Sequence, residues 1–172
     1  MNASCSKRMA DMTTTIIIEK LKVAFGDDIQ SVQEFRGETT VYVKPAAIAT
    51  ICTFLKDLPD APFDYLVDVC GADNFTPEGR FEVIYNIYSL RTKIRLRLKT
   101  RVEENGARLP SVTPVWPGAD WPERETYDMF GIEFTGHPDL RRIYMPEEFA
   151  HHPLRKDFPL MGIPDSIPLP RK

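Results

Sequence analysis

The sequence is poor in cysteine and has no long apolar run. Its 172 residues include three cysteines, Cys5, Cys52 and Cys70, and none belongs to a C-x-x-C pair. An odd, scattered set argues against a disulfide framework and favours a reducing compartment. Iron–sulfur ligation normally needs about four cysteines at close spacing, so this sequence does not predict an iron–sulfur cluster. Because no run of roughly eighteen apolar residues is present, we expect no membrane-spanning helix, and we also expect no secretory or organelle-targeting leader.

The sequence has no large excess of either charge. Lysine and arginine number 22 against 25 aspartates and glutamates, a net charge of −3, which is not typical of a dedicated nucleic-acid binder. The sequence contains neither a P-loop nor a GxGxxG motif, so it does not predict a nucleotide-binding site. Proline, in contrast, is abundant: there are fifteen, most of them from Pro110 onward. Such a region packs poorly into helices or sheets, so we expect an extended segment that lies along another surface.

Hydrophobic periodicity predicts an α+β domain in the first hundred residues, with two helices packed on a mainly antiparallel sheet of four to five strands. The predicted helices span 13–26 and 45–58, and the predicted strands span 29–35, 39–43, 63–70, 80–88 and 92–102. We divide the chain into a disordered N-terminus (1–12), the α+β domain (13–102), a region of linker and short helix (103–145) and an extended docking tail (146–172).

Two predicted strands have distinctive patterns. Residues 63–70 show little alternation, which favours a strand buried on both faces. Residues 92–102 alternate strictly, so the apolar residues face a core while one face carries Lys93, Arg95, Arg97, Lys99 and Arg101. This basic face could bind phosphates, but it has no aromatic pair for stacking bases. We favour a solvated face, partly paired to Asp64, Asp68 and Glu82 on neighbouring strands; contact with an acidic partner subunit is the alternative.

A linker with a turn at Asn105-Gly106 leads to the stretch 120–157, where charges, aromatics and histidines are densest. Asp120 is suited to an N-cap, Glu123 would complete a capping box, and Gly131 can end the helix in a left-handed conformation. Every face of this helix mixes charge with large apolar groups. On the helix alone, an ordinary surface helix with exposed salt bridges is the favoured interpretation. A helix covered by its own core on one side and by another protein on the other is the alternative that this mixed pattern suggests.

A long motif spans this helix and the residues after it. Its fixed positions are Glu123-Arg124-Glu125, Asp128-Met129-Phe130, His137, Arg141 and Ile143-Tyr144. The spacers between them are two, six, three and one residues long, in that order. The motif resembles the signature of the C subunit of respiratory complex I, the 30 kDa subunit family of NADH-quinone oxidoreductase, which is also found in energy-converting hydrogenases and related quinone reductases. The resemblance covers roughly residues 63–160, including the segments DYLVDVCGAD and HHPLRKDFPL.

The resemblance implies a structural subunit in the hydrophilic arm of a proton-translocating enzyme, on the cytoplasmic side of the bacterial inner membrane. Its expected partners are the large quinone-site subunit and the small iron–sulfur subunit of the same enzyme. It implies no cofactor in this chain, because the FMN or other donor site, the iron–sulfur clusters and the quinone belong to other subunits. An equivalent subunit of a membrane-bound hydrogenase or a ferredoxin–quinone reductase is the alternative. The electron donor, the quinone and the pumped ion stay open.

No catalytic residue is expected. The residues expected to contact partner subunits are Glu123, Arg124, Glu125, Asp128, His137, Arg141, Arg142, His152, Arg155 and Phe158. Arginine suits such interfaces because its planar fork binds carboxylates bidentately. We also expect residues 154–169 to run extended over a neighbour, with Phe158, Leu160 and Ile163 as anchors.

Two hypotheses from other functional classes rank lower. A free-standing enzyme or metal site could use the carboxylates and histidines of residues 120–157. However, His151 and His152 are adjacent and bracketed by prolines, so their side chains would diverge rather than converge on a metal. A nucleic-acid module could use the cations of residues 93–101 and would then bind with a steep salt dependence.

Overall fold

The computed structural model describes residues 3–163. Its helices are α1 (Ala3–Phe25), α2 (Ile48–Lys56) and α3 (Asp120–Phe130), with short 3₁₀ turns η1 (Gly26–Asp28), η2 (Pro45–Ala47) and η3 (Pro117–Ala119). Its strands are β1 (Ile29–Phe35), β2 (Glu38–Val43), β3 (Tyr65–Asp73), β4 (Phe81–Tyr88), β5 (Arg95–Val102), β6 (Arg108–Pro110) and β7 (Glu133–Thr135). In the described part of the chain, no helix is long and apolar enough to cross a membrane.

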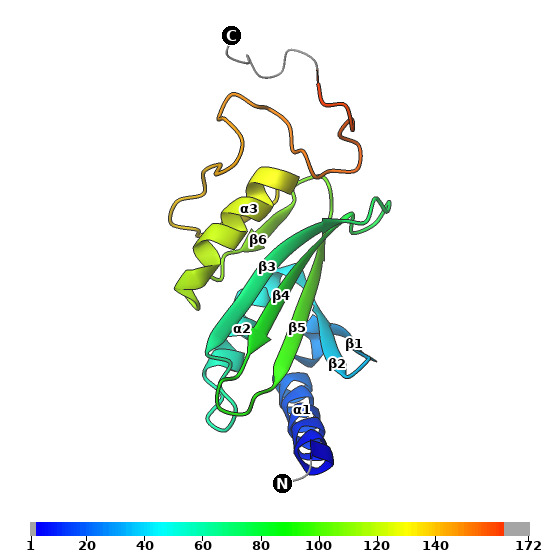
Figure 1. Ribbon diagram of the computed structural model, residues 1–172, viewed down its shortest axis with the longest axis vertical. Helices are drawn as coiled ribbons and strands as arrows, with labels where there is room; N and C mark the ends of the chain where they lie inside the picture. Colours follow the sequence, from blue (N-terminus) through cyan, green and yellow to red (C-terminus); the bar gives the residue numbers. More distant parts are fainter. Residues whose placement is uncertain (1–2, 164–172) are drawn as a thin grey trace.

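The main sheet has the strand order β1-β2-β5-β4-β3. Its pairings are antiparallel except for β2 with β5, which is parallel. The parallel pair arises because the chain leaves β2 through α2, crosses to the far edge and returns as the antiparallel run β3, β4, β5 (Figure 1). The predicted α+β fold and mainly antiparallel sheet are therefore confirmed. A second sheet, the parallel pair β6–β7, lies outside that prediction.

One hydrophobic core holds the helices against the main sheet. It extends from Ile17 in α1 to Phe134 in β7. The segment predicted to be a linker belongs to this core, because Leu109, Val112 and Trp116 are almost completely buried. The turn-forming residues of this segment suggested an exposed connection. Burial of its apolar side chains has the larger energetic effect and places the segment in the core. The hydrophobic core therefore continues across the predicted domain boundary at residue 102.

The strand β3 differs from its prediction. It is the last strand of the sheet, so within residues 3–163 no strand lies along its outer edge. Tyr65 and Val67 are 52% and 51% exposed. The prediction that residues 63–70 are buried on both faces is therefore wrong, because a short apolar run does not distinguish an edge strand from a central one. At the other end of the chain, α1 starts at Ala3, although the sequence predicts disorder over 1–12; residues 1–2 lie outside the described part.

The outer face of the sheet carries the predicted row of cations, most of which are paired. Lys99 and Arg101 form ion pairs with Glu82, and Arg97 pairs with Glu38. The prediction of a partly paired face is confirmed for Glu82. The other two carboxylates act locally instead: Asp64 accepts the backbone N–H of Leu90, and Asp68 accepts the thiol of Cys70. Lys93 lies in a turn with φ of 63° rather than in the strand.

Candidate functional site

The helix α3 begins differently from the prediction. It follows directly from the 3₁₀ turn η3, its N-cap residue is Ala119, and no side chain caps it. The predicted N-cap at Asp120 and the capping box with Glu123 are therefore wrong. Because the preceding turn already continues into the helix, Glu123 is free to point inward. The predicted end is confirmed: Gly131 has a left-handed φ of 76° and its N–H donates to the carbonyl of Tyr127.

Glu123 anchors the start of α3 to the segment that follows β6. Its carboxylate is completely buried and accepts hydrogen bonds from the Ser111 hydroxyl at 2.6 Å and the Val112 N–H at 2.8 Å. Burial raises the pKa of Glu123 to about 7, although the two hydrogen bonds oppose this shift. His137 Nε2 lies 3.2 Å from the Asp120 carbonyl oxygen and 4.0 Å from the Glu123 carboxylate. The predicted residues Glu123 and His137 thus meet inside the chain.

Asp128 organises the segment that follows β7. Its side chain is completely buried. One carboxylate oxygen accepts three successive backbone N–H groups, from Ile143 at 3.1 Å, Tyr144 at 2.7 Å and Met145 at 2.9 Å. The other oxygen pairs with Arg142 at 3.0 Å. A single carboxylate therefore wraps residues 142–145 around α3 without any regular secondary structure.

The C-terminal end of α3 is closed by a later part of the chain. The carbonyl groups of its last three residues have no partner within the helix. His152 Nδ1, the Leu154 N–H and Arg155 Nε donate to them in turn, at 2.9, 3.2 and 2.7 Å. Burial lowers the pKa of His152. An added Cβ at Gly131 would lie 2.5 Å from the ends of the His152 and Arg155 side chains, which would have to shift, and the left-handed φ would strain the backbone as well. We call residues 136–158 the clasp; in Figure 1 it loops around α3.

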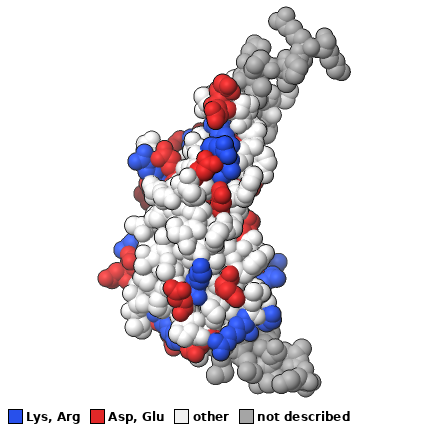
Figure 2. Space-filling model, turned by 90° about the vertical axis from the view of Figure 1, so that its left-hand side faces the viewer, with Lys and Arg blue, Asp and Glu red and all other residues white. Residues whose placement is uncertain are grey.

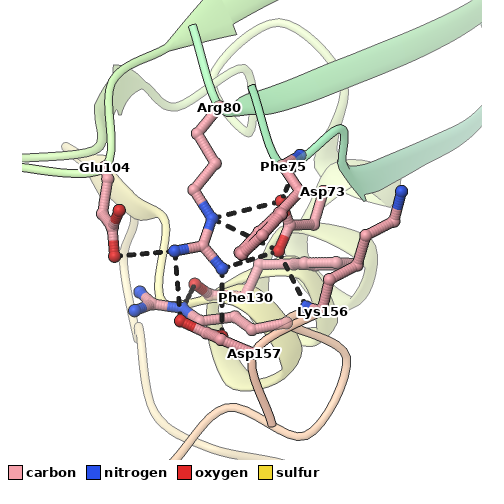
Figure 3. Close-up of polar contacts among 8 residues, drawn as sticks. Asp73, Phe75, Arg80, Glu104, Phe130, Lys156 and Asp157 are labelled. Atoms are coloured by element: carbon pink, nitrogen blue, oxygen red, sulfur yellow. Dashed lines mark hydrogen bonds and ion pairs between the residues drawn. The ribbon is translucent and has the colours of Figure 1, made fainter. Parts of the chain in front are cut away.

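A buried arginine ties the end of the clasp to the sheet (Figure 3). Arg80 is 5% exposed and pairs with Asp73 at 2.8 Å, Glu104 at 2.7 Å and Asp157 at 3.0 Å. Asp73 also accepts the N–H of Lys156 at 2.8 Å. Sequence reasoning missed this cluster. A signal was present, because Asp73 and Arg80 are opposite charges at the two ends of one predicted strand–turn–strand connection.

The residues predicted to bind partners divide into three groups. Glu123, Arg124, Asp128 and the side chain of His137 are buried within this chain. Arg142, His152, Arg155 and Phe158 are half-buried, and Glu125 and Arg141 are exposed. Much of the charge in the motif is therefore used to hold the clasp in place. Contact with partners stays a prediction, and it falls most directly on the exposed members.

The predicted docking tail also folds back on its own chain. Asp157 pairs with Arg80, and the Phe158 ring lies 6.1 Å from the ring of Phe149. Leu160 and Met161 beyond it are almost fully exposed, and residues 164–169 lie outside the described part of the chain. Among the side chains of residues 14–163, no group of three His, Cys, Asp or Glu is arranged to hold a metal ion.

Large apolar side chains lie exposed on α3 and on the clasp region. Trp121 is 65%, Tyr144 60% and Leu154 54% exposed. Figure 2 shows the side of the molecule that lies on the left in Figure 1. A broad area without charged residues crosses the middle of this side, and charged residues gather above and below it. Exposed aromatic and aliphatic groups on a rigid support are typical of protein–protein contacts.

Comparison with known proteins assigns the chain to a family. The family described as respiratory-chain NADH dehydrogenase, 30 Kd subunit, matches residues 41–164. The NADH-quinone oxidoreductase C subunit of Roseiflexus sp. (strain RS-1) is 49% identical over 144 residues, which cover 84% of this chain and 83% of the relative. The corresponding C subunit of Geotalea uraniireducens (strain Rf4) is 46% identical over 161 residues, 93% of this chain and 96% of the relative.

Solved structures share the fold. The trypsin-resistant fragment of Nqo5 has a TM-score of 0.63 at 30% identity, covering 72% of this chain and 98% of the fragment. A chain of the archaeal membrane-bound sulfane sulfur reductase has a TM-score of 0.71 at 23% identity, covering 87% of both chains, and this likeness concerns the fold alone. On the family match and the extent of identity, the chain belongs to the 30 kDa subunit family of respiratory-chain NADH dehydrogenase, the family of the NADH-quinone oxidoreductase C subunits.

Proposed function

We propose that this chain is a non-catalytic structural subunit of the peripheral arm of a proton-translocating NADH-quinone oxidoreductase. It braces the large quinone-site subunit and the small iron–sulfur subunit while electrons pass to quinone, on the cytoplasmic side of the membrane. It binds no redox cofactor of its own. Sequence identity of 46–49% to proteins named as C subunits of NADH-quinone oxidoreductase favours this role over the equivalent subunit of a hydrogenase or ferredoxin–quinone reductase.

The observation that carries the proposal is the construction of the clasp. Residues 136–158 form hardly any regular structure. They are nevertheless held by buried carboxylates at Asp73 and Asp128 and by the carbonyl groups at the end of α3. An irregular segment has no regular backbone pairing to hold it in place, so the position of the clasp depends on these buried polar contacts. The fixed position of a segment without regular structure calls for a functional explanation. A pre-organised surface that docks without an ordering cost is such an explanation.

The chemistry of the motif also fits a structural role. Asp128 accepts four hydrogen bonds from its own chain, and Glu123 accepts two. A general acid or base must reach a substrate proton, whereas both of these carboxylates are completely buried. We infer that the buried polar groups of the motif support the shape of the surface. Exposed groups on α3 and the clasp, Trp121, Tyr144 and Leu154 among them, then contact the partner subunits.

The test is co-purification of a tagged chain expressed together with the other subunits of its enzyme. After detergent extraction of membranes, the tagged chain should elute with the quinone-site and iron–sulfur subunits. Leu154→Asp places a charge on the clasp surface and should lower the recovered fraction about tenfold or more. Leu90→Asp is the matched control, because Leu90 is 49% exposed in the turn between β4 and β5, away from α3. A wild-type chain that elutes as a free monomer would refute the proposal.

A further inference from the structure

Arg124 is a buried cation whose polar contacts are made with carbonyl groups rather than with a carboxylate. The residue is 7% exposed. Its guanidinium donates to the carbonyl oxygens of Arg141 at 3.1 Å and Arg142 at 3.4 Å. No carboxylate of the described residues lies within ion-pair distance of it, whereas the buried Arg80 and the half-buried Arg142 both have one. An unpaired buried charge is costly, so its presence here calls for a reason.

The two carboxylates that lie one helical turn from Arg124, on its face of α3, do not pair with it. Asp128, one turn later, pairs with Arg142 and accepts three backbone N–H groups. Asp120, one turn earlier, lies 3.4 Å from His137 and forms no ion pair with Arg124. Backbone carbonyl groups therefore supply the polar contacts of the guanidinium, and they carry no net charge to balance it. Part of its donor capacity is left over, because a guanidinium has five N–H groups.

The aromatic group beside Arg124 is exposed. The Arg124 guanidinium carbon lies 5.1 Å from the ring of Trp121, a cation–π distance. Trp121 itself is 65% exposed. Tryptophan and arginine are among the residue types most enriched at the positions that dominate binding energy in protein interfaces. A protein that covers the indole also removes the remaining water from the guanidinium, which raises the cost of leaving this charge unpaired.

We propose that Trp121 and Arg124 form an anchor for a partner subunit that presents an aspartate or glutamate. The partner's apolar surface covers the indole ring, and its carboxylate pairs with the free N–H groups of Arg124. The argument for this occupant is charge complementarity, because Arg124 is a fixed cation and the described part of its own chain supplies no counter-ion. This inference rests on the proposed function and names the chemistry of one contact within it.

The test compares Arg124→Met with the wild type in reconstitution of the enzyme from membranes that lack this subunit. Methionine keeps much of the volume and removes the charge. If the partner presents a carboxylate, that group is left buried and unpaired, and the apparent Kd should rise by about 30-fold or more. If the partner surface has no carboxylate, burying methionine costs less than burying an unpaired guanidinium. Binding would then be equal or tighter, and the inference would be overturned.

Two further variants separate the charge from the local fold. Arg124→Lys restores the positive charge and should recover a large part of the lost affinity, because the pair with the carboxylate is regained. Arg108→Met is the matched control, since Arg108 is exposed and already pairs with Glu133 of its own chain at 2.7 Å. Its Kd should change by less than about twofold. Hydrogen exchange on each isolated variant shows whether residues 141–145 keep their protection.

The outcomes distinguish this inference from the proposed function. If wild-type chain assembles but Arg124→Met binds as tightly, or if Arg124→Lys fails to recover affinity while residues 141–145 stay protected, the carboxylate contact is wrong and the structural role survives. If the wild-type chain does not assemble, the structural role itself fails. Trp121→Ala should weaken binding independently of charge. Formation of a stable homodimer that is lost in Trp121→Ala would assign the anchor to a second copy and overturn the inference.

Discussion

Asp128 is the residue on which the shape of the clasp depends most. Its carboxylate accepts three backbone N–H groups and pairs with Arg142. Asp128→Asn removes the charge and replaces one acceptor oxygen with a donor that faces those groups. We expect residues 142–145 to lose about 2–3 kcal/mol of protection, because hydrogen bonds to a charged group contribute about that much. Hydrogen exchange measured by mass spectrometry would locate the loss.

The same experiment has an internal reference and a control. The strands β4 and β5 should keep their protection in Asp128→Asn, since neither contacts this carboxylate. Asp139→Asn alters an exposed aspartate that pairs with Arg141 at the surface. It should change exchange by less than about 1 kcal/mol. Equal loss of protection throughout the sheet would mean that Asp128 supports the whole core rather than the clasp.

Glu123 makes the stability of the domain fall as the pH rises, which is the opposite of the effect of a carboxylate whose pKa is lowered by an ion pair. Burial raises its pKa from 4.5 to about 7. The folded chain therefore holds a proton that the unfolded chain releases between these two values. Stability from this group is complete below about pH 4.5 and is lost as the pH rises through about 7. A shift of this size corresponds to about 3 kcal/mol of unfolding free energy.

Glu123→Gln isolates this contribution. Glutamine resembles the protonated acid and does not titrate, so the variant should lack the loss of stability between about pH 5 and 7.5. Urea unfolding of the wild type and the variant across this range measures the difference directly. Parallel pH profiles for the two proteins would show that Glu123 stays ionised in the folded chain.

At the scale of elements, the end of α3 depends on Gly131. Its φ of 76° disfavours any side chain, and an added Cβ would also meet His152 and Arg155 at 2.5 Å. We expect Gly131→Ala to displace residues 152–155 and to destabilise the chain by about 2 kcal/mol or more, since left-handed strain alone costs about 1–2 kcal/mol. Thermal unfolding and limited proteolysis of the clasp would measure both effects.

Gly106→Ala separates strain from contact. Gly106 has nearly the same φ, 75°, but nothing lies within 4 Å of the position that a Cβ would take there. Alanine at this site therefore introduces the conformational strain without a collision. The variant should lose only about 1–2 kcal/mol and keep the clasp resistant to protease. If the two variants are equally destabilised, the close approach of the clasp to Gly131 has no energetic weight.

The elements show where sequence patterns are informative. Alternation placed β4 and β5 correctly, and Gly131 marked the end of α3, because these signals act locally. The start of α3 and the exposure of β3 depend on what lies next to them. Asp120 has the right chemistry for an N-cap, yet the turn η3 already supplies the helix entry. Likewise, the apolar run of β3 says nothing about its place at the edge of the sheet.

At the scale of the whole molecule, a regular α+β core carries an irregular clasp. The motif residues were visible in the sequence, but their partners were not. Asp128 binds backbone groups 15 to 17 positions away, and Asp73 binds the N–H of Lys156, 83 positions away. Backbone donors leave no trace in side-chain patterns. The sequence therefore indicated that charge was concentrated here, while the structure shows that much of it acts within the chain.

The attachment between clasp and core depends on Arg80, which joins Asp73 and Glu104 to Asp157. Asp73 is 8% exposed. Burial raises its pKa, but hydrogen bonds from Arg80 and from backbone N–H groups outweigh this and lower it to about 2. Arg80→Met leaves this carboxylate buried and unpaired. We expect a loss of about 3–5 kcal/mol in the unfolding free energy of the isolated chain, measured in urea at pH 7.

Asp157→Asn should behave differently, because it removes an exposed member of the cluster and keeps the Arg80–Asp73 pair. Asp157 is about half exposed. Global stability should fall by less than about 1 kcal/mol, while protease cleavage after Lys156 becomes faster. The two variants therefore separate the stability of the core from the attachment of the clasp. If Asp157→Asn unfolds the chain as readily as Arg80→Met, clasp and core form one cooperative unit, and partner subunits meet a surface that cannot open without unfolding the domain.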